Sequence, residues 1–268
     1  QDWELIIIDN YSDDGTIDKI REYSDPRIKV IQIRNNGIIA VSRNSGVRTA
    51  VGDFIAFLDS DDSWFSEKLS LAYKEITKGH HFIYHHANLI SSSGDKVGRI
   101  KSRRLRSKQF EDLILNGNPI VNSTVVVRRQ LLIELGMISE SPNLAGVEDY
   151  NTWLRLSRAG ITLHLVDRYL ANYRVHDKSF SSTPKDLGVP WQAFDGLEKD
   201  IKGDFKMIIE SRFWEIQGRT AFRDRRFLNA YQYLILSING ASGFREIRIR
   251  FLLLLAKFFG CKLMHKTG

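Results

Sequence analysis

The chain has 268 residues, of which 43% are hydrophobic and 26% are charged, so it can bury a globular core without covalent staples. Its single cysteine excludes an internal disulfide framework and fits a reducing compartment, and no apolar run reaches the ~20 residues that cross a bilayer. The net charge of +7 suits nucleic acid, an anionic membrane or phosphorylated substrates without choosing among them.

Residues 1–100 alternate between two hydrophobic patterns. Apolar runs predict strands over 3–9, 27–33, 53–59 and 81–90. Glycine-bounded amphipathic segments predict helices over 14–24, 35–52 and 66–79. This alternation predicts an α/β fold with a parallel or mixed sheet covered by helices.

The remainder of the chain is less regular and then becomes helical. Between 101 and 188 the patterns predict a helix over 109–117, a strand over 121–129, a helix over 148–160 and one or two strands over 161–176. Beyond 189 they predict a helix pair over 204–224 and 225–238 and a further helix over 244–259.

The stretch "FIAFLDSDDSW" runs from an apolar strand, expected to be buried on both faces, into the carboxylates Asp59, Asp61 and Asp62. The first strand likewise ends in Asp9. Ligands of open α/β sheets bind at the carboxyl ends of strands, and crowded carboxylates need a cation. The sequence therefore predicts a crevice for a divalent metal with a phosphorylated ligand, and all-oxygen ligation favours Mg²⁺ or Mn²⁺ over zinc.

A simpler interpretation is that these acids only cap helices and form turns, and it is preferred for Asp13, Asp14 and Asp62. For Asp59 and Asp61 both interpretations stay open. If they bind a ligand, Asp59 meets a ribose hydroxyl and Asp61 a metal, while Asp9 accepts a hydrogen bond from a nucleobase.

Three segments in order resemble a family 2 glycosyltransferase of the GT-A fold: "ELIIIDNYSDDGT", "NNGIIAVSRNSGVRTAVGDFIAFLDSDDSW" and "EDYNTWLRLSRAG". "YRVHDKSFS" is similar to the segment that closes the catalytic domain in many bacterial members, so the resemblance covers roughly residues 1–185. It implies an α/β, Rossmann-like mixed sheet flanked by helices, with a C-terminal helical extension. It also implies a nucleotide-sugar-binding half over 1–100, an acceptor-binding and catalytic half over 101–188, and the extension over 189–268.

The resemblance assigns roles around the donor. Asp9 matches the carboxylate that contacts the donor base, and Arg43 matches a basic position near the base and diphosphate. Asp59 and Asp61 match the two acids of the DXD motif, of which the second is the usual metal ligand. The metal is accordingly expected to be Mn²⁺ or Mg²⁺.

Two further residues are assigned in the same way. Asp149 matches the catalytic base, although Glu148 and Asp149 also suit the positive end of a helix dipole. We expect catalysis by Asp149 and helix support by Glu148. His176 matches a histidine that completes the metal site in some relatives, with a packed histidine as the alternative.

The sequence departs from the family pattern in two places. Family members usually begin with a strand resembling "SIIIPTYN" and a helix, which normally help to grip the base, so we expect a fragment or a sequence that omits its beginning. Asn10 stands where many relatives carry a second aspartate.

The expected activity is sugar transfer, with inversion, from a nucleotide-diphosphate sugar. A UDP-sugar is the expected donor, and the acceptor is expected to be a glycan or lipid-linked glycan of a bacterial surface polysaccharide or glycolipid. The alternatives are a non-catalytic nucleotide-binding scaffold and a nucleotidyltransferase, although no glycine-rich triphosphate loop is present. Nucleic acid is not expected as a partner, because no aromatic residues interleave the cations between Arg99 and Lys108, which suit a solvated loop or an anionic acceptor.

Two features remain outside the site. The last predicted helix carries one apolar stripe, formed by Phe244, Ile247, Phe251, Leu254, Leu255 and Phe258. This stripe either packs on the preceding helix pair or lies on an anionic membrane. We therefore expect a cytoplasmic protein, with contact at the inner membrane face as the second interpretation. The histidine-rich "HHFIYHHANL" is not expected to bind zinc, because His85 and His86 point to opposite faces of a strand.

Overall fold

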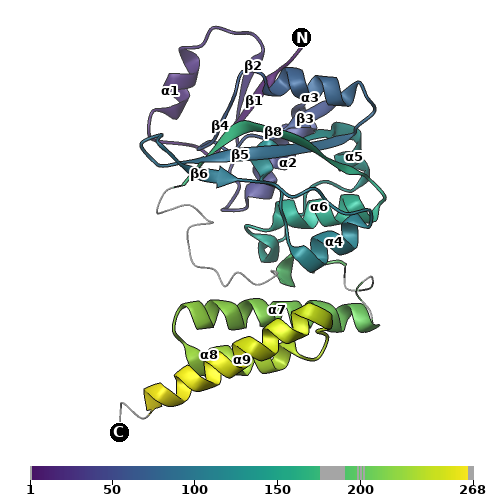
Figure 1. Cartoon of the computed structure of the whole chain (residues 1–268). Coiled ribbons are helices and arrows are strands. Elements are labelled where there is room, and N and C mark those ends of the chain that lie inside the picture. The colour runs from purple at the N-terminus through teal and green to yellow at the C-terminus, as the bar shows by residue number, and fades with distance from the viewer. Residues whose placement is uncertain (1, 176–190, 198, 200, 202, 265–268) are drawn as a thin grey trace. The chain divides into compact units, whose positions relative to one another are not determined.

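The computed structural model describes residues 2–175, 191–197, 199, 201 and 203–264, and its contacts divide the chain into two compact units (Figure 1). The first unit comprises Gln1–Phe110 and Asn118–His176. The second comprises Glu111–Gly117 and Asp177–Gly268. Each unit is described by itself.

The first unit contains two sheets. Strands β1 (Leu5–Asp9) and β2 (Ile28–Gln32) pair in parallel, with α1 (Thr16–Arg21) between them in the chain. The larger sheet has the order β3-β7-β5-β8-β4, with β6 paired to β5. Its strands are β3 (Phe54–Ala56), β4 (Ser63–Trp64), β5 (Phe82–Ile90), β6 (Lys96–Ile100), β7 (Val126–Arg128) and β8 (Leu163–Arg174).

The direction of the strands defines two edges of the larger sheet. β5 and β8 are parallel and lie side by side along most of their length (Figure 1). β7 is antiparallel to both β3 and β5, so β3, β5 and β8 all run the same way. Their carboxyl ends therefore share one edge, where the acids after β3 lie, and their amino ends share the opposite edge.

In the first unit α2 (Ile39–Thr49), α3 (Lys68–Ile76) and α6 (Glu148–Arg158) follow the sequence prediction. The short helix α5 (Arg129–Glu134) was not predicted. Gly79 and Gly160, placed after α3 and α6, both have the positive φ of a helix stop. α6 is anchored by Trp153, which is buried and meets Phe82 of β5 edge-to-face at 4.9 Å between ring centroids. Such aromatic burial contributes about 2–3 kcal/mol and holds the first turn of α6 in place.

Two strand predictions differ from the structure, and two observed strands were not predicted. β3 is short and only half-buried, because in the described strand order it is terminal and pairs only with β7, so its prediction as a doubly buried strand is wrong. The strand with that character is β5, in which eight of nine residues are buried. The strand expected over 121–129 is instead a 3₁₀ turn, Asn122–Thr124, followed by β7. β4 and β6 were not predicted, because short strands depend on their partners.

The described part of the second unit is helical. It includes most of α4 (Gln109–Asn116), then a 3₁₀ turn (Trp191–Phe194), α7 (Gly203–Arg223), α8 (Phe227–Ser237) and α9 (Gly243–Met264). α7 and α8 pack closely at Gly218, where an added Cβ would lie 2.6 Å from Leu234 Cγ. α9 is tied to α7 by Arg245, whose Nε donates to Glu215 Oε2 at 2.6 Å. None of the helices in the described residues combines the length and apolarity needed to cross a membrane.

The apolar stripe of α9 does not pack on the helix pair. The face that packs against α8 carries Ile249 and Ala256, both fully buried. The stripe itself is largely exposed, at Phe244, Ile247, Phe251, Leu254 and Phe258. Leu255 is half-buried. Packing was therefore the wrong interpretation of this stripe.

Candidate active site

Arg43 of α2 joins two acids that lie far apart in the sequence. Its Nη1 donates to Glu148 Oε1 at 2.5 Å and its Nη2 to Asp59 Oδ1 at 2.9 Å. The same Asp59 oxygen accepts from Asn122 Nδ2 at 2.9 Å, and the Asp59 N–H donates to Ser123 Oγ at 3.0 Å. This network fixes the turn after β3 against the amino end of α6.

Arg174, the last residue of β8, holds the same turn from another side. Its Nε donates to the Asp61 carbonyl at 3.0 Å, and its backbone N–H donates to Asp62 Oδ1 at 2.9 Å. Its Nη1 donates to the carbonyls of Ser91 and Ser92, each at 3.0 Å. One guanidinium thus connects the acidic turn to the loop after β5.

A buried cation lies next to the turn. Lys68 is fully buried, and its Nζ donates to the Ser123 carbonyl at 2.8 Å and lies 3.6 Å from the Trp64 ring centroid. Burial lowers the pKa of Lys68 well below its usual value, against the opposing charge of Asp62. Burial raises the pKa of Asp62 to about 6, and its Oδ2 has no hydrogen-bond partner among the described residues. The Asp62 side chain therefore contacts β8 through Arg174 and lies near Lys68, and its predicted turn-forming role stays a prediction.

Asp149 lies in the first turn of α6. Its Oδ1 accepts the Tyr150 N–H at 2.6 Å, and burial raises its pKa to about 7. The neighbouring Glu148 charge acts in the same direction, and Arg43 opposes it. A carboxyl with a pKa close to neutral accepts protons effectively at physiological pH, which is the property of a general base.

Glu148 makes contacts beyond its own helix, more than an acid that only stabilises the helix dipole would need. It is buried, and while one oxygen binds Arg43, its Oε2 accepts the Gly146 N–H at 2.7 Å. Glu148 therefore connects α6 both to α2 and to its own preceding loop. Its charge also raises the pKa of Asp149.

Asp9 ends β1 as a buried carboxylate. The Ser12 N–H donates to both of its oxygens, at 3.2 and 3.3 Å, and Gln32 Nε2 donates to Oδ2 at 2.9 Å. Hydrogen bonds from Ser12 and Gln32 lower its pKa, so Asp9 is ionised at neutral pH.

Asn10 ties the end of β1 to α2. Its Oδ1 accepts the Asn35 N–H at 2.9 Å, and Asn35 Nδ2 donates to Ser42 Oγ at 2.9 Å. Ser42 precedes Arg43 in the helix. Asp9 and Arg43 therefore lie on connected elements, although no direct contact joins them in the described hydrogen bonds.

The residues present fit a divalent metal at this turn. Mg²⁺ is commonly held by one or two carboxylates together with substrate phosphates and water, and Asp59 and Asp61 offer that set. Asp61 is half-buried in the turn that Arg174 holds. His176, the third expected metal-site residue, lies outside the described residues. The metal therefore stays a prediction.

The comparison with known proteins decides the family. The family described as Glycosyl transferase family 2 matches residues 1–136, just over half of the chain. The chain belongs to glycosyltransferase family 2. This family 2 chain is 33% identical over 201 residues to TuaG of Bacillus subtilis (strain 168), a glycosyltransferase whose name places it in teichuronic acid biosynthesis; the match covers 74% of the chain and 77% of TuaG.

Two further proteins support the assignment. WfgD of Escherichia coli, a UDP-Glc:α-D-GlcNAc-diphosphoundecaprenol β-1,3-glucosyltransferase, is 31% identical over 206 residues, covering 76% of the chain and 75% of WfgD. The crystal structure of Staphylococcus aureus TarS 1–349 with UDP-GlcNAc superposes with a TM-score of 0.61 at 18% identity, covering 96% of the chain and 78% of that 1–349 chain. The glycosyltransferase therefore has the GT-A fold, as its sequence predicted.

The structure brings together three predicted residues of this glycosyltransferase, Arg43, Asp59 and Asp149, through ion pairs and electrostatic interactions. It adds two that sequence reasoning missed, Asn122 and Arg174. Neither carries a local signal, because each acts on a turn more than sixty residues away in the chain. Asn122 appears in the sequence only as part of a predicted strand.

Proposed function

We propose that the chain transfers a sugar from a nucleotide-diphosphate donor, with UDP as the nucleotide, to a hydroxyl group of a glycan or lipid-linked glycan. The Arg43 bridge carries this proposal, because it joins the Asp59 turn to Glu148, the residue next to Asp149. A donor-binding turn and a carboxyl with a raised pKa are thereby held in one network. Sugar transfer needs the bound donor diphosphate and a proton-accepting carboxyl to act at the same anomeric carbon.

In this mechanism the oxygen of the acceptor hydroxyl attacks the anomeric carbon, and Asp149 accepts the proton of that hydroxyl. Attack opposite the leaving diphosphate inverts the anomeric centre. Asp59 and Asp61 would hold Mn²⁺ or Mg²⁺, which would supply Lewis-acid stabilisation of the leaving diphosphate. Asp9 accepts a hydrogen bond from the nucleobase, and its lowered pKa keeps it ionised for that contact.

Known proteins support the choice of donor and acceptor. TarS was crystallised with UDP-GlcNAc and with UDP, and the names of WfgD and WfaP of Escherichia coli give UDP-Glc as donor and a diphosphoundecaprenol-linked sugar as acceptor. We extend this chemistry to the present chain. Its exposed cations at Arg99 and Lys101 suit an acceptor that carries a diphosphate.

Calorimetric titration of UDP, GDP and dTDP, with and without Mn²⁺, tests the donor site. We expect UDP to bind in a manner that requires both Mn²⁺ and Asp61, so that Asp61→Ala abolishes the metal-dependent part. Asp149→Asn should bind UDP normally but lose turnover with UDP-sugars. Equal turnover in Asp149→Asn would refute the base assignment, binding without any turnover by the unaltered chain would favour a scaffold, and pyrophosphate release from UTP would favour a nucleotidyltransferase.

We further propose that α9 contacts the inner face of an anionic cell membrane, where a lipid-linked acceptor would lie. The exposed apolar stripe described above is accompanied on α9 by the exposed cations Arg248, Arg250 and Lys257. Apolar side chains beside cations are the surface that binds anionic bilayers.

Sedimentation with vesicles tests this contact. Phe251 and Val97 are similarly exposed apolar residues, at 59% and 61%, but Val97 lies on β6. We expect Phe251→Glu to reduce binding to phosphatidylglycerol vesicles at least tenfold and Val97→Glu to have little effect. Equal binding by both variants, or equal binding to neutral phosphatidylcholine, would contradict the proposal.

A further inference from the structure

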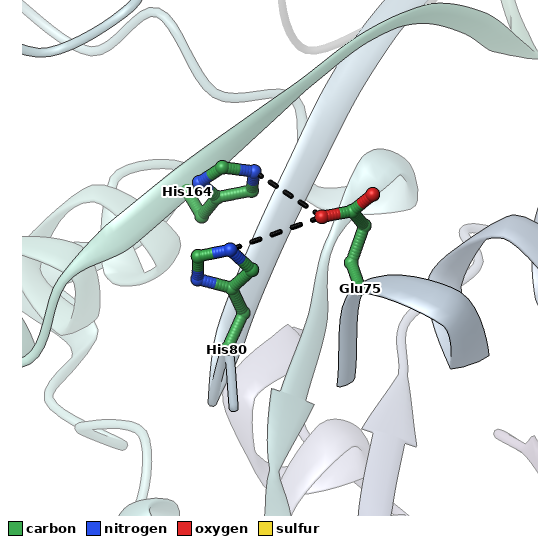
Figure 2. Close-up of side chains that lie close together, drawn as sticks. All are labelled: Glu75, His80 and His164. Atoms are coloured by element: carbon green, nitrogen blue, oxygen red, sulfur yellow. Dashed lines mark ion pairs between the residues drawn. The ribbon is translucent and has the colours of Figure 1, made fainter. Parts of the chain in front are cut away.

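Three potential metal ligands converge away from the residues discussed so far. Glu75 lies near the end of α3, His80 follows in the turn before β5, and His164 is the second residue of β8. Figure 2 shows both imidazole rings presenting a nitrogen to the Glu75 carboxylate. Glu75 Oε2 lies 3.5 Å from His164 Nε2 and 3.8 Å from His80 Nε2, and the three ligand atoms all lie within 4.8 Å of one another.

This cluster occupies the opposite edge of the sheet from the candidate active site. His164 pairs with Ile83 near the amino ends of β8 and β5, whereas Arg174, which holds the Asp61 turn, is the last residue of β8. At about 3.3 Å per strand residue, His164 and Arg174 are roughly 30 Å apart. A metal at this cluster would therefore be distinct from any metal that binds a donor diphosphate.

We propose that Glu75, His80 and His164 form a Zn²⁺ site. Two imidazole nitrogens and one carboxylate oxygen suit Zn²⁺, and three protein ligands leave a fourth position for water. Tetrahedral ligands at zinc bond lengths lie about 3.3 Å apart, which is close to the Glu75–His164 separation.

Metal binding requires one local change. The two rings are stacked, with centroids 3.7 Å apart and planes 13° apart, whereas a metal lies in the plane of each imidazole that binds it. The rings must therefore tilt out of the stack. His80 and His164 have side-chain exposures of 30% and 25%, and His80 lies between the turn after α3 and β5, so neither ring is fully enclosed.

The surroundings of the cluster prepare its ligands. Lys78 Nζ donates to Glu75 Oε1 at 2.7 Å, which orients the carboxylate and leaves Oε2 facing the histidines. Burial lowers the pKa of His164, as do His80, Arg104 and Lys78, whereas Glu75 raises it. Lys78 and Arg104 also repel a cation, and the Glu75 charge offsets that repulsion.

A zinc ion here would link the turn after α3 to the start of β8. These segments contact each other only after the chain has folded, so metal binding would stabilise the first unit. Zinc content by elemental analysis, affinity by competition with a chromophoric chelator, and Tm with and without Zn²⁺ test the site. We expect one Zn²⁺ per chain, a raised Tm, and visible Co²⁺ absorption of the tetrahedral type.

Matched variants locate the ion. His164→Ala and Glu75→Gln should weaken Zn²⁺ binding by more than about 100-fold, beyond the 10–100-fold cost of losing an outer partner. His81→Ala removes the adjacent exposed histidine, which is not part of the cluster, and should bind as the unaltered chain does. If His164→Ala is poorly folded, Glu75→Gln and His80→Ala decide the question alone.

The site is independent of the proposed transferase activity, and one variant separates the two. Asp61→Ala should keep the full Zn²⁺ affinity and the full Tm shift. Loss of zinc in Asp61→Ala, equal binding in the cluster variants, or no Zn²⁺ bound by the folded chain would each overturn the proposal.

Discussion

The raised pKa of Asp149 makes replacement of its carboxyl the most informative perturbation. A carboxyl whose folded-state pKa lies above its ordinary value of 3.8, here about 7, disfavours folding once it ionises. This cost is absent below about pH 4, grows between about pH 4 and 7, and is complete above pH 7. About three pKa units correspond to about 4 kcal/mol, which is an upper value because part of the side chain is accessible to solvent.

Asp149→Asn should therefore stabilise the protein at pH 8 by about 1–4 kcal/mol and have little effect at pH 4. The same variant should lower kcat by about 10²–10⁴-fold, the usual contribution of a general base. Urea unfolding followed by tryptophan fluorescence at both pH values measures the first effect. A UDP-release assay with a UDP-sugar and acceptor measures the second.

Glu148→Gln is the matched control in the same helical turn. Glu148 is buried and paired with Arg43, so its replacement should destabilise the protein at pH 8, opposite in sign to Asp149→Asn. If Asp149→Asn instead lost about 0.3–1 kcal/mol, Asp149 would serve the helix dipole and the argument for a base would fail.

Arg43→Met leaves Asp59 and Glu148 without their shared cation and should lower the free energy of unfolding, measured in urea, by about 3–5 kcal/mol. Arg43→Lys should recover only part of this stability, because one ammonium group cannot reproduce both fixed contacts. A loss below 1 kcal/mol would show that the bridge is weak. Arg174→Met should lower kcat/KM for the donor about 10–100-fold through displacement of the acidic turn, measured by steady-state kinetics, and an unchanged KM and kcat would contradict that role. Gly218→Ala should destabilise the α7–α8 pair by about 1–3 kcal/mol, because the added Cβ would lie 2.6 Å from Leu234. Gly260→Ala, whose added Cβ would lie 3.8 Å from its nearest atom, should raise the stability by about 0.5–1 kcal/mol. A higher melting temperature for Gly218→Ala than for Gly260→Ala in calorimetry would refute the packing argument.

Local sequence patterns were sufficient to predict most of the helices and strands such as β1 and β2. The alternation of apolar and polar residues, together with glycine stops such as Gly79 and Gly160, predicted α3 and α6 to within a few residues. These signals are local, since helix periodicity and positive φ depend on near neighbours. The run of acids after β3 predicted a donor-binding turn from the same kind of local signal, and that role stays a prediction.

Pairing and burial depend on contacts distant in sequence. The apolar stretch at Phe54 predicted a doubly buried strand, but β3 is terminal in the described sheet, and only the strand order shows this. The sequence likewise left open whether the α9 stripe packs on the helix pair, and only the contacts of Ile249 and Ala256 show which face is covered. An apolar residue in the sequence predicts that its side chain favours burial, but it does not predict which surface will cover that side chain.

The sequence by itself determined the α/β class, the family, and which acids to examine. Only the tertiary structure placed Arg43 between Asp59 and Glu148, and this placement connects the donor turn to Asp149. The histidines illustrate the same division. The expectation that "HHFIYHHANL" binds no zinc considered only His85 and His86, whose opposite directions are a local property of a strand, whereas the proposed zinc site uses His80 of the same segment. The pairing of His80 with His164 arises from the parallel contact of β5 and β8, which only folding creates.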